Sequence, residues 1–287
     1  MRRNERFDVI LRTLSDAGNV GVGRLAIRLN VSQMTIRRDL EALERRGQLR
    51  RVHGGAVPAT ARGYELPFEV RQGHRAEDKR RIGQAAAELL RTGEIVLLDT
   101  GTTTLEVARA MRDRHDLTVI TPSLHIAGLL SEAPGVECIS LGGRVRAAEN
   151  ATFGSLTLRG LAGFNADVCV IATGGISVDG GVTEYDPEAA AVTRAQMDRA
   201  QRVMVVADQH KLGQVTFAHV ADVAAIDVLV TCADPDHAEL VALERAGVTV
   251  VNVAAERDRG ALPEFGGPPL GYGGTVDAVE DDPGRPE

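Results

Sequence analysis

The sequence contains little cysteine and no long apolar run. Three cysteines occur among 287 residues, and their odd number and unpaired spacing argue against a disulfide framework or a zinc site. Cys138, Cys169 and Cys232 all fall in apolar stretches, which favours buried, reduced thiols. No stretch reaches the roughly 18 apolar residues of a membrane helix, and the N-terminus, MRRNERFD, lacks the apolar core of a signal peptide. These absences predict a cytoplasmic protein.

Motifs for nucleotides and metals are missing as well. The sequence has neither GxxxxGK followed by Ser or Thr, nor GxGxxG after a predicted strand. The seven histidines show no metal-ligand spacing. We therefore expect no metal and no cofactor.

Lysine is scarce, with two lysines against 31 arginines. Lys211 follows a predicted strand and lies near Asp208 in the sequence. In a chain that otherwise uses arginine, this choice indicates that a compact ammonium is needed, as a point charge for phosphate or for proton chemistry. The alternative is an ordinary surface lysine.

Charge is divided unevenly along the chain, whose net charge is −7. Residues 1–57 hold 12 arginines and 6 acidic residues, a net charge of +6. The remainder holds 21 basic and 34 acidic residues, a net charge of −13. A basic end on an acidic body predicts a nucleic-acid surface at the N-terminus, where the release of counterions supplies affinity. The acidic remainder should be repelled from DNA.

The stretch VSQMTIRRDLEAL, residues 31–43, predicts an amphipathic helix. Ile36, Leu40 and Leu43 repeat at helical spacing, and Ser32 is a good N-cap. Two shorter apolar patterns, at 7–14 and 25–29, predict helices before it, in the order of a helix-turn-helix. Residues 48–52 predict a strand and Gly54–Gly55 a turn, which together form a wing. The predicted DNA contacts are Ser32, Gln33, Thr35, Arg37 and Arg38 on the helix and Arg50, Arg51 and His53 on the wing.

The sequence VSQMTIRRDLEALERRGQLRRVHGGA resembles the N-terminal signature of DeoR-type bacterial transcriptional regulators nearly position for position. The resemblance implies a DNA-binding head and a repressor rather than an activator. From the pattern alone, a small basic helical domain that docks on protein is the alternative.

The chain divides into four segments. Residues 1–57 predict a winged helix-turn-helix domain, and 58–75, rich in Pro and Gly, a linker that packs in part through Leu66, Phe68 and Val70. Residues 76–257 predict an α/β domain, and 258–287 a disordered, acidic tail rich in Gly and Pro.

In the α/β segment, short apolar runs alternate with helical patterns. This alternation predicts a mostly parallel sheet that is covered by helices on both faces. The expected helices are 77–91, 104–114, 123–132, 187–200 and 236–246. The expected strands are 95–98, 118–121, 136–141, 168–172, 203–207, 226–231 and 248–253.

Small and polar residues follow five of these strands. Because ligands bind outside the carboxyl ends of parallel strands, these loops predict a site for a phosphorylated small molecule. Glycine and threonine in such turns can also serve geometry alone. The loops are 99–104, 121–123, 142–144, 172–175 and 208–213.

The motifs EDKRRIGQAA, LLDTGTTT, LGGRVR and VADQHKLG resemble those of the DeoR-type C-terminal domain. That resemblance implies a fold related to ribose-5-phosphate isomerases, a sugar-phosphate effector, and contacts from Asp99, Gly101, Thr102, Thr103, Thr104, Lys211 and Lys79. The other candidates for the effector site are Thr121, Gly142, Gly143, Gly174 and Asp208.

Three positions depart from the family pattern, namely Pro122, His210 and Cys232. These departures bear on the identity of the effector and on how strongly it binds.

The leading hypothesis is an oligomeric repressor of carbohydrate genes that binds an operator with half-sites a helical turn or a multiple apart. A phosphorylated sugar would control its DNA affinity. One rival is a sugar-phosphate isomerase with a DNA-binding head, which would use Asp99, Asp208, Glu184 and Lys211. Another rival is a regulator whose α/β domain only mediates assembly.

Overall fold

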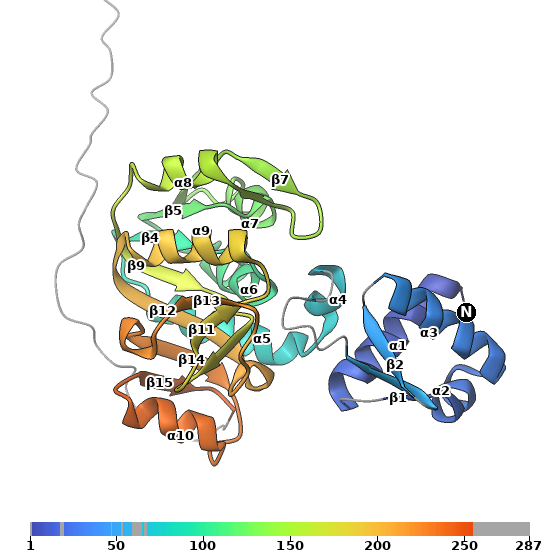
Figure 1. Cartoon of the computed structure of the whole chain (residues 1–287). Helices are drawn as coiled ribbons and strands as arrows, with labels where there is room; N and C mark the ends of the chain where they lie inside the picture. Colours follow the sequence, from blue (N-terminus) through green and yellow to red (C-terminus); the bar gives the residue numbers. More distant parts are fainter. Residues whose placement is uncertain are drawn as a thin grey trace, which may run out of the picture.

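The computed structural model describes residues 2–17, 20–46, 48–52, 54–58, 65 and 68–254. Within these residues, the N-terminal part, called the head (residues 2–58), contains three helices and a three-stranded antiparallel sheet of order β1-β3-β2 (Figure 1). Its elements are α1 (Arg3–Ala17), β1 (Val20–Gly21), α2 (Val22–Leu29), α3 (Gln33–Arg45), β2 (Leu49–Val52) and β3 (Gly55–Pro58).

The head folds around the apolar faces that the sequence predicts. Ile10, Leu25, Ile36 and Leu43 are buried together, and each fully buried aliphatic side chain is worth about 1.5–3 kcal/mol. The predicted wing is present as β2 and β3, but β1 was not predicted. It pairs with β3 across the close approach of Gly55, where a Cβ would lie 1.9 Å from the Val20 carbonyl oxygen.

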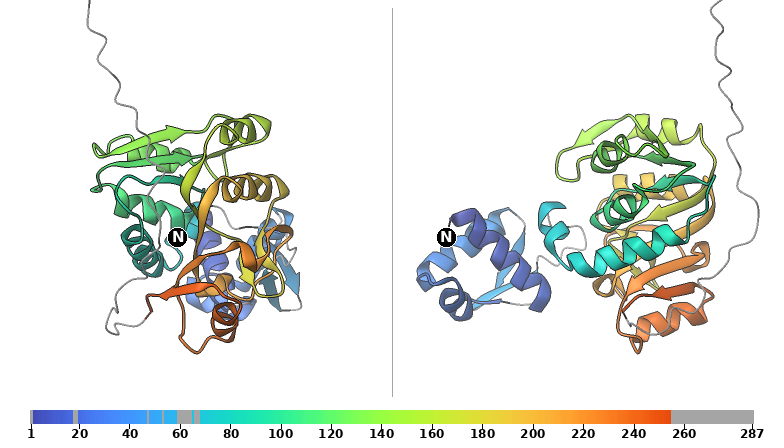
Figure 2. Two further views of the ribbon diagram at one scale, coloured as in Figure 1. Left: turned by 90° about the vertical axis from the view of Figure 1, so that its left-hand side faces the viewer. Right: turned by 180° about the vertical axis from the view of Figure 1, so that it is seen from behind.

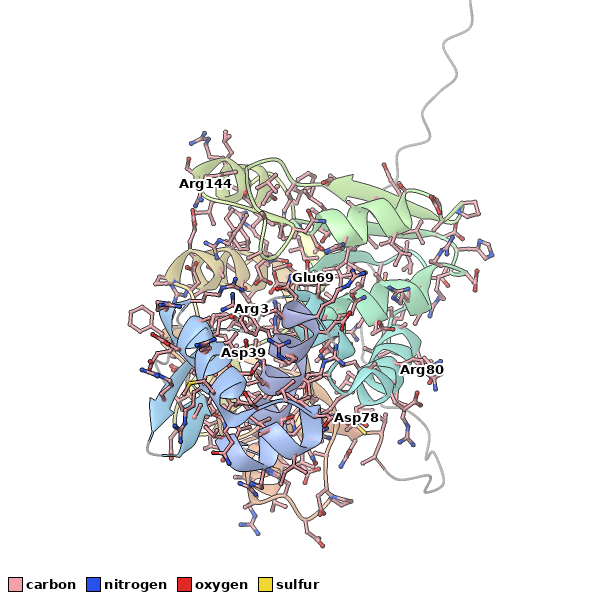
Figure 3. All side chains as sticks on the ribbon, turned by 90° about the vertical axis from the view of Figure 1, so that its right-hand side faces the viewer. Arg3, Asp39, Glu69, Asp78, Arg80 and Arg144 are labelled. Carbon is pink, nitrogen blue, oxygen red and sulfur yellow. The ribbon has the colours of Figure 1, made fainter. Side chains whose placement is uncertain are left out.

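A buried ion pair ties α1 to α3. The Arg6 Nε lies 2.7 Å from Asp39 Oδ2, and Asp39 is 2% exposed. Arg3 adds a longer contact of 3.6 Å to the same carboxylate (Figure 3). The pair holds α1 against α3. It does not involve the cationic side chains on the outer face of α3.

The remainder, called the body (residues 68–254), is built on a seven-stranded parallel sheet. All seven predicted strands are present and form this sheet, in the order β15-β14-β12-β9-β4-β5-β6. The strands are β4 (Ile95–Leu98), β5 (Leu117–Thr121), β6 (Val136–Ser140), β9 (Ala166–Ile171), β12 (Ala200–Asp208), β14 (Val228–Cys232) and β15 (Thr249–Asn252). The order reverses between β4 and β9, which are neighbours although β5 and β6 separate them in sequence.

Helices cover both faces of the sheet, as predicted (Figure 2). One face packs against α5 (Ala76–Glu88), α6 (Thr102–Met111) and α7 (Leu124–Leu130) through residues such as Ile82, Leu105 and Ile126. The other face packs against α8 (Ser155–Leu161), α9 (Pro187–Met197) and α10 (Ala238–Arg245) through residues such as Val192 and Leu243. Alternate residues of each strand enter the two cores, since successive side chains point to opposite faces.

Several elements were not predicted. The predicted linker 58–75 contains a helix, α4 (Phe68–Gly73), which is anchored by the buried ring of Phe68 stacked on His125 at 4.5 Å. A hairpin of β7 (Arg144–Arg146) and β8 (Ala151–Phe153) follows β6. A second sheet, of β10 (Gly175–Ser177), β11 (Gly181–Glu184) and β13 (Ala218–Ala221), is antiparallel.

The predicted tail, 258–287, lies outside the described residues, as do Leu66 and His53. Among the helices of the described residues, none has the length and apolar character needed to cross a membrane.

Candidate functional site

The outer face of α3 carries the predicted base-reading residues. Ser32 caps the helix, because its Oγ accepts a hydrogen bond of 3.1 Å from the Thr35 amide. Gln33, Arg37 and Arg38 are exposed, whereas Thr35 is partly covered and bonded through its own hydroxyl to Ser32. The helix therefore presents an amide and two guanidinium groups at its N-terminal half, the part that enters the major groove in helix-turn-helix proteins.

Arg51 on the wing is held by Glu44 of α3, since its Nε lies 2.6 Å from one carboxylate oxygen and its backbone amide 2.8 Å from the other. Arg51 thus braces the wing against α3 in this structure, and its contact with a DNA phosphate stays a prediction. Arg50 lies on β2, opposite residue 57 of β3. Met34, which the sequence analysis did not single out, is 55% exposed on the first turn of α3.

A cavity of about 570 Å³ opens at the carboxyl ends of β4, β9 and β12. It lies at the reversal of strand order, where ligands bind in open α/β sheets. Head residues Leu14, Asp16 and Gln48 contribute to its wall. Of the predicted effector residues, those that line the cavity are Lys79, Asp99, Gly101, Thr102, Thr103, Asp208 and Lys211.

The other five predicted effector residues serve the scaffold and do not line this cavity. Thr104 Oγ1 donates to the Gly101 carbonyl at 3.1 Å, and Thr121 Oγ1 accepts from the Ser123 amide at 3.1 Å. Thr121 is the last residue of β5, and Gly142 and Gly143 follow β6. These are the outer strands on one side of the reversal.

Gly142 and Gly143 lie next to Thr157, which is in the first turn of α8. The Gly142 carbonyl accepts from Thr157 Oγ1 at 3.0 Å, and a Cβ at Gly143 would come within 2.1 Å of that oxygen. The Gly174 amide donates to Glu184 Oε1 at 2.9 Å. Close packing therefore accounts for Gly143 and Gly174, whereas a Cβ at Gly142 would meet no atom within 4 Å.

The first turn of α6 lines the cavity, and among the described residues its backbone amides have no side-chain cap. No side chain caps the helix at Gly101, and the first main-chain bond of the turn runs from Leu105 to the Gly101 carbonyl. Gly101 is needed for close approach, because a Cβ there would lie 2.7 Å from Ala172 at the end of β9. An uncapped helix N-terminus carries a partial positive charge and suits an anion.

Both lysines of the chain point into this cavity. Lys79 on α5 is 5% exposed, and its Nζ donates to the Arg71 carbonyl at 2.6 Å. Burial lowers its pKa from 10.5 to about 8, and within the described residues it forms no ion pair. Lys211 Nζ lies 5.2 Å from the centre of the Tyr185 ring and 3.8 Å from Glu65 Oε1. Burial would lower the pKa of Lys211, but Tyr185 and Glu65 raise it above its usual value.

Two buried carboxyl groups have raised pKa values. Burial raises the pKa of Glu184 to about 8, and the neighbouring carboxylate of Glu65 acts in the same direction. Burial also raises the pKa of Asp99 to about 6, although hydrogen bonds from Gln196 and Thr193 to its two oxygens act against this. Asp99 is therefore occupied by α9 on both oxygens, and burial together with Glu65 favours the protonated form of Glu184.

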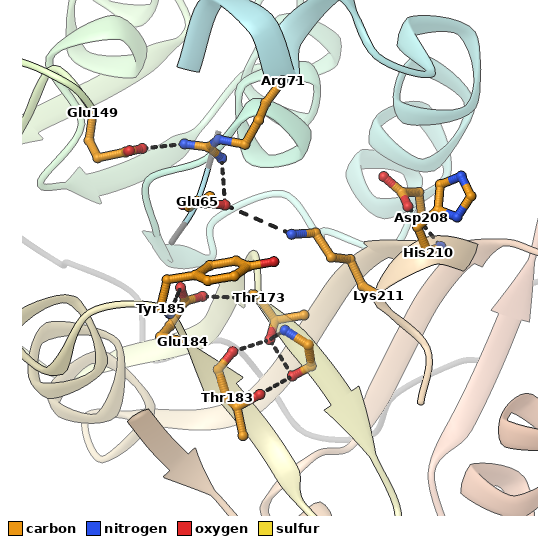
Figure 4. A network of polar contacts seen from close by, with 12 residues as sticks. Glu65, Arg71, Glu149, Thr173, Thr183, Glu184, Tyr185, Asp208, His210 and Lys211 are labelled. Carbon is orange, nitrogen blue, oxygen red and sulfur yellow. Dashed lines mark hydrogen bonds and ion pairs between the residues drawn. The ribbon is translucent and has the colours of Figure 1, made fainter. Parts of the chain in front are cut away.

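Sequence reasoning missed the cluster formed by Glu65, Arg71 and Glu149 (Figure 4). Arg71 Nη1 lies 3.1 Å from Glu65 Oε1, and its Nη2 forms an ion pair with Glu149. All three residues line the cavity. Arg71 falls within the predicted linker. The one nearby feature of the sequence that could have indicated a position in the cavity is Phe68, an apolar residue three positions earlier.

The chemistry of the cavity favours an anion over a metal. Among the described residues, no group of three or more His, Cys, Asp and Glu side chains has a geometry that could hold a metal ion. The free donors of α6 and the two ammonium groups instead suit phosphate oxygens.

Two family models match the chain. One, described as the DeoR C terminal sensor domain, matches residues 74–233, and the other, a DeoR-like helix-turn-helix domain, matches residues 6–62. The chain belongs to the DeoR family of transcriptional regulators.

Curated relatives of this DeoR family regulator match over most of their length. A putative aga operon transcriptional repressor from Escherichia coli O157:H7 is 32% identical and covers 87% of this chain and 94% of its own. The regulator GlpR from Haloferax volcanii is 35% identical, with 88% and 98% covered. The repressor GlcR from Bacillus subtilis is 33% identical, with 91% and 99% covered.

Solved structures give a weaker likeness. Ribose 5-phosphate isomerase A from Methanocaldococcus jannaschii is 14% identical with a TM-score of 0.35, covering 46% of this chain and 52% of its own. The beta subunit of eIF2B from Chaetomium thermophilum is 16% identical with a TM-score of 0.40, covering 54% and 48%. Neither likeness bears on activity.

Two of the three departures from the family pattern lie away from the cavity of the DeoR regulator. The Pro122 carbonyl accepts from the Thr152 amide at 2.9 Å, and Cys232 Sγ contacts Asp78 at 3.6 Å. Only His210 lines the cavity, and its backbone amide donates to Asp208 at 3.0 Å. In the described part of the chain, Pro122 and Cys232 therefore do not line the cavity.

Proposed function

We propose that this DeoR family regulator is a repressor whose affinity for its operator depends on a phosphorylated sugar bound in the body. One observation carries the proposal. The uncapped N-terminus of α6 and both lysines of the chain, Lys79 and Lys211, open into one cavity at the reversal of strand order. That combination matches a phosphate group, which needs main-chain donors and compact positive charges.

The remaining surface of the cavity suits the rest of such a ligand. Its volume, about 570 Å³, falls in the range of small-molecule sites. The protonated carboxyl of Glu184 and the Asp208 carboxylate supply partners for sugar hydroxyl groups. The names of relatives agree, since they include repressors for an aga operon and for a glycerol-3-phosphate regulon.

On the DNA side, we propose that Gln33, Arg37 and Arg38 read base edges, with Met34 against a thymine methyl. A dimer or larger assembly would place two heads on half-sites a helical turn or a multiple apart. The cytoplasm is the compartment that such a regulator requires.

We propose no catalytic role for the body. An isomerase needs a carboxylate base that is free to reach the substrate. Both oxygens of Asp99 accept hydrogen bonds from α9, and one oxygen of Asp208 accepts from the His210 amide, so neither carboxylate is fully free to reach a substrate.

Thermal melting against a panel of ligands tests the effector proposal. The panel holds ribose 5-phosphate, glucose 6-phosphate, fructose 1-phosphate, glycerol 3-phosphate, inorganic phosphate and the unphosphorylated sugars. A ligand that binds the native state must stabilise it, by about 2.7 kcal/mol at a hundred times its Kd. We expect a saturable rise in Tm with one phosphorylated compound. The rise should be lost in Lys211→Met and kept in Arg159→Met, a control that removes an exposed cation from α8. No shift across the panel would contradict the proposal.

A further inference from the structure

Glu65 brings a carboxylate into the cavity from the stretch of sequence that joins the head to the body. Its Oε1 lies between two cations, 3.1 Å from Arg71 Nη1 and 3.8 Å from Lys211 Nζ (Figure 4). In the described part of the chain, Glu65 is the only carboxylate within ion-pair distance of Lys211. The charge that the proposed function assigns to a phosphate is therefore already met by a group of the protein.

Acidic side chains outnumber basic ones in the lining of the cavity. Seven acidic side chains line the cavity against five lysines and arginines. A carboxylate that rests on these cations would compete with a dianionic phosphate for the same positive charge. Both oxygens of Asp99 are bonded to α9, and Glu184 Oε1 accepts from the Gly174 amide. Glu65 is the carboxylate that rests on the cations themselves.

We propose that Glu65 is an internal anion that occupies the phosphate position on Lys211 and Arg71, and that the effector acts by displacing it. This rests on the proposed function. Glu65 lies seven positions after Pro58, where the last strand of the head ends, and six before Arg71. Exchange of Glu65 for phosphate would thus release a residue that lies in the sequence between the last strand of the head and the body, and we propose that this release changes operator affinity. The coupling is an equilibrium, because the ligand competes with a contact present only in the unliganded form.

The two lysines make this exchange directly measurable. Because the chain has only Lys79 and Lys211, protein labelled with ¹³C at the lysine ε carbon gives two signals, both from the cavity. In Glu65→Gln the pKa of Lys211 should fall, since its carboxylate partner is gone. Saturating inorganic phosphate should raise it again. Glu69→Gln, an exposed neighbour on α4 (Figure 3), is the control and should leave both signals unchanged.

Affinity for inorganic phosphate gives the second measurement. When a site is blocked part of the time by its own carboxylate, its apparent affinity falls in proportion to the fraction of time that the site is open. Glu65→Gln should therefore bind inorganic phosphate about tenfold more tightly than the wild-type chain in calorimetry. Without any ligand, its operator affinity should shift in the same direction as the wild-type affinity shifts with effector.

The outcomes separate this proposal from the proposed function. Equal phosphate affinity in wild type and Glu65→Gln overturns the displacement and leaves the effector site standing. An unchanged Lys211 pKa in Glu65→Gln overturns it as well, because the ion pair would then be absent in solution. Failure of both proteins to bind phosphate or any compound of the panel overturns both proposals.

Discussion

The head and the body of this regulator place their charges in different ways. The head leaves Arg37 and Arg38 exposed on α3 and buries one compensated pair, Arg6 with Asp39. The body buries Lys79, and one cavity gathers Lys211, Arg71 and three glutamates, Glu65, Glu149 and Glu184. DNA presents a dense and fixed array of phosphates, so exposed arginines suffice to bind it. A single small anion must be recognised by side chains inside a cavity. There, the desolvation of a cationic side chain lowers the pKa of that side chain and reduces the stability of the fold.

The largest effect is expected when the ion pair between Arg6 and Asp39 in the head is removed. Asp39→Ala removes the carboxylate that Arg6 Nε contacts at 2.7 Å, and loss of a charge-assisted hydrogen bond in this partly buried site costs about 1–3 kcal/mol. We expect the head to unfold first and operator binding to be lost, while the melting shift with effector persists in the body. Denaturant unfolding followed by circular dichroism, together with ligand melting, measures both. Loss of effector binding as well would show that the two parts do not fold separately.

A smaller effect is expected from the outer face of α3. Arg37→Ala should weaken operator binding by about 1–3 kcal/mol if Arg37 reads a base, with effector affinity unchanged. Arg45→Ala is the matched control, since Arg45 is 70% exposed at the other end of the same helix. Fluorescence anisotropy with labelled operator at fixed salt measures the difference. Equal losses in both variants would point to a general effect of charge and remove Arg37 from base recognition.

In the body, Lys79→Met should bind effector poorly and yet be more stable. Below pH 8 the folded state holds a buried ammonium whose pKa is about 8, compared with 10.5 for an ordinary lysine, at a cost of about 3 kcal/mol. Losing its bond to the Arg71 carbonyl offsets about 1 kcal/mol. We expect a net gain of about 2 kcal/mol in urea unfolding at pH 7.

The pH dependence of that gain has a definite sign. Between pH 8 and 10.5 the unfolded wild-type chain binds more protons than the folded one, so wild-type stability rises with pH. The advantage of Lys79→Met should shrink over this interval. A gain that stays constant through pH 10 would contradict the assignment of its cause to the buried charge.

The smallest expected effect concerns the pH dependence of effector binding. The charged form of Lys79 attracts the phosphate, and this form is lost above its pKa of about 8. The Kd for the phosphorylated effector should be flat from about pH 7 to 8 and then rise by up to about tenfold per pH unit. Calorimetry from pH 7 to 9.5 measures this, and the Kd of Lys79→Met should stay flat. A flat wild-type profile would place Lys79 away from the bound phosphate.

Local patterns predicted the head and the seven strands well, because a helix face or a buried strand is visible within about ten residues. Local patterns could not show which of the loops at the strand ends line the cavity. Gly101 and Gly142 both follow strands, yet only Gly101 reaches the cavity, since β4 lies at the reversal and β6 at the edge of the sheet. The order of parallel strands is set by packing across the whole domain, and no single loop encodes it.

The ion pairs of the cavity are equally non-local. Arg71 and Glu149 are 78 positions apart in the sequence. Glu65 and Lys211 also form an ion pair, although several strands of the parallel sheet lie between them in the sequence. The hairpin of β7 and β8, which brings Glu149 to Arg71, was not predicted because its strands are only three residues long. The predicted site therefore contained both lysines and the first turn of α6 but lacked Glu65, Arg71 and Glu149.

One measurement tests most directly the claim that the anion site in the body controls the head. Operator affinity is measured by anisotropy for wild type and Lys211→Met, each with and without the phosphorylated sugar that raises Tm. We predict that the sugar shifts the wild-type Kd by about 5- to 150-fold, the usual range for allosteric coupling. Lys211→Met should bind the operator equally tightly under both conditions. A wild-type affinity that does not respond, or a full response in Lys211→Met, would contradict the account.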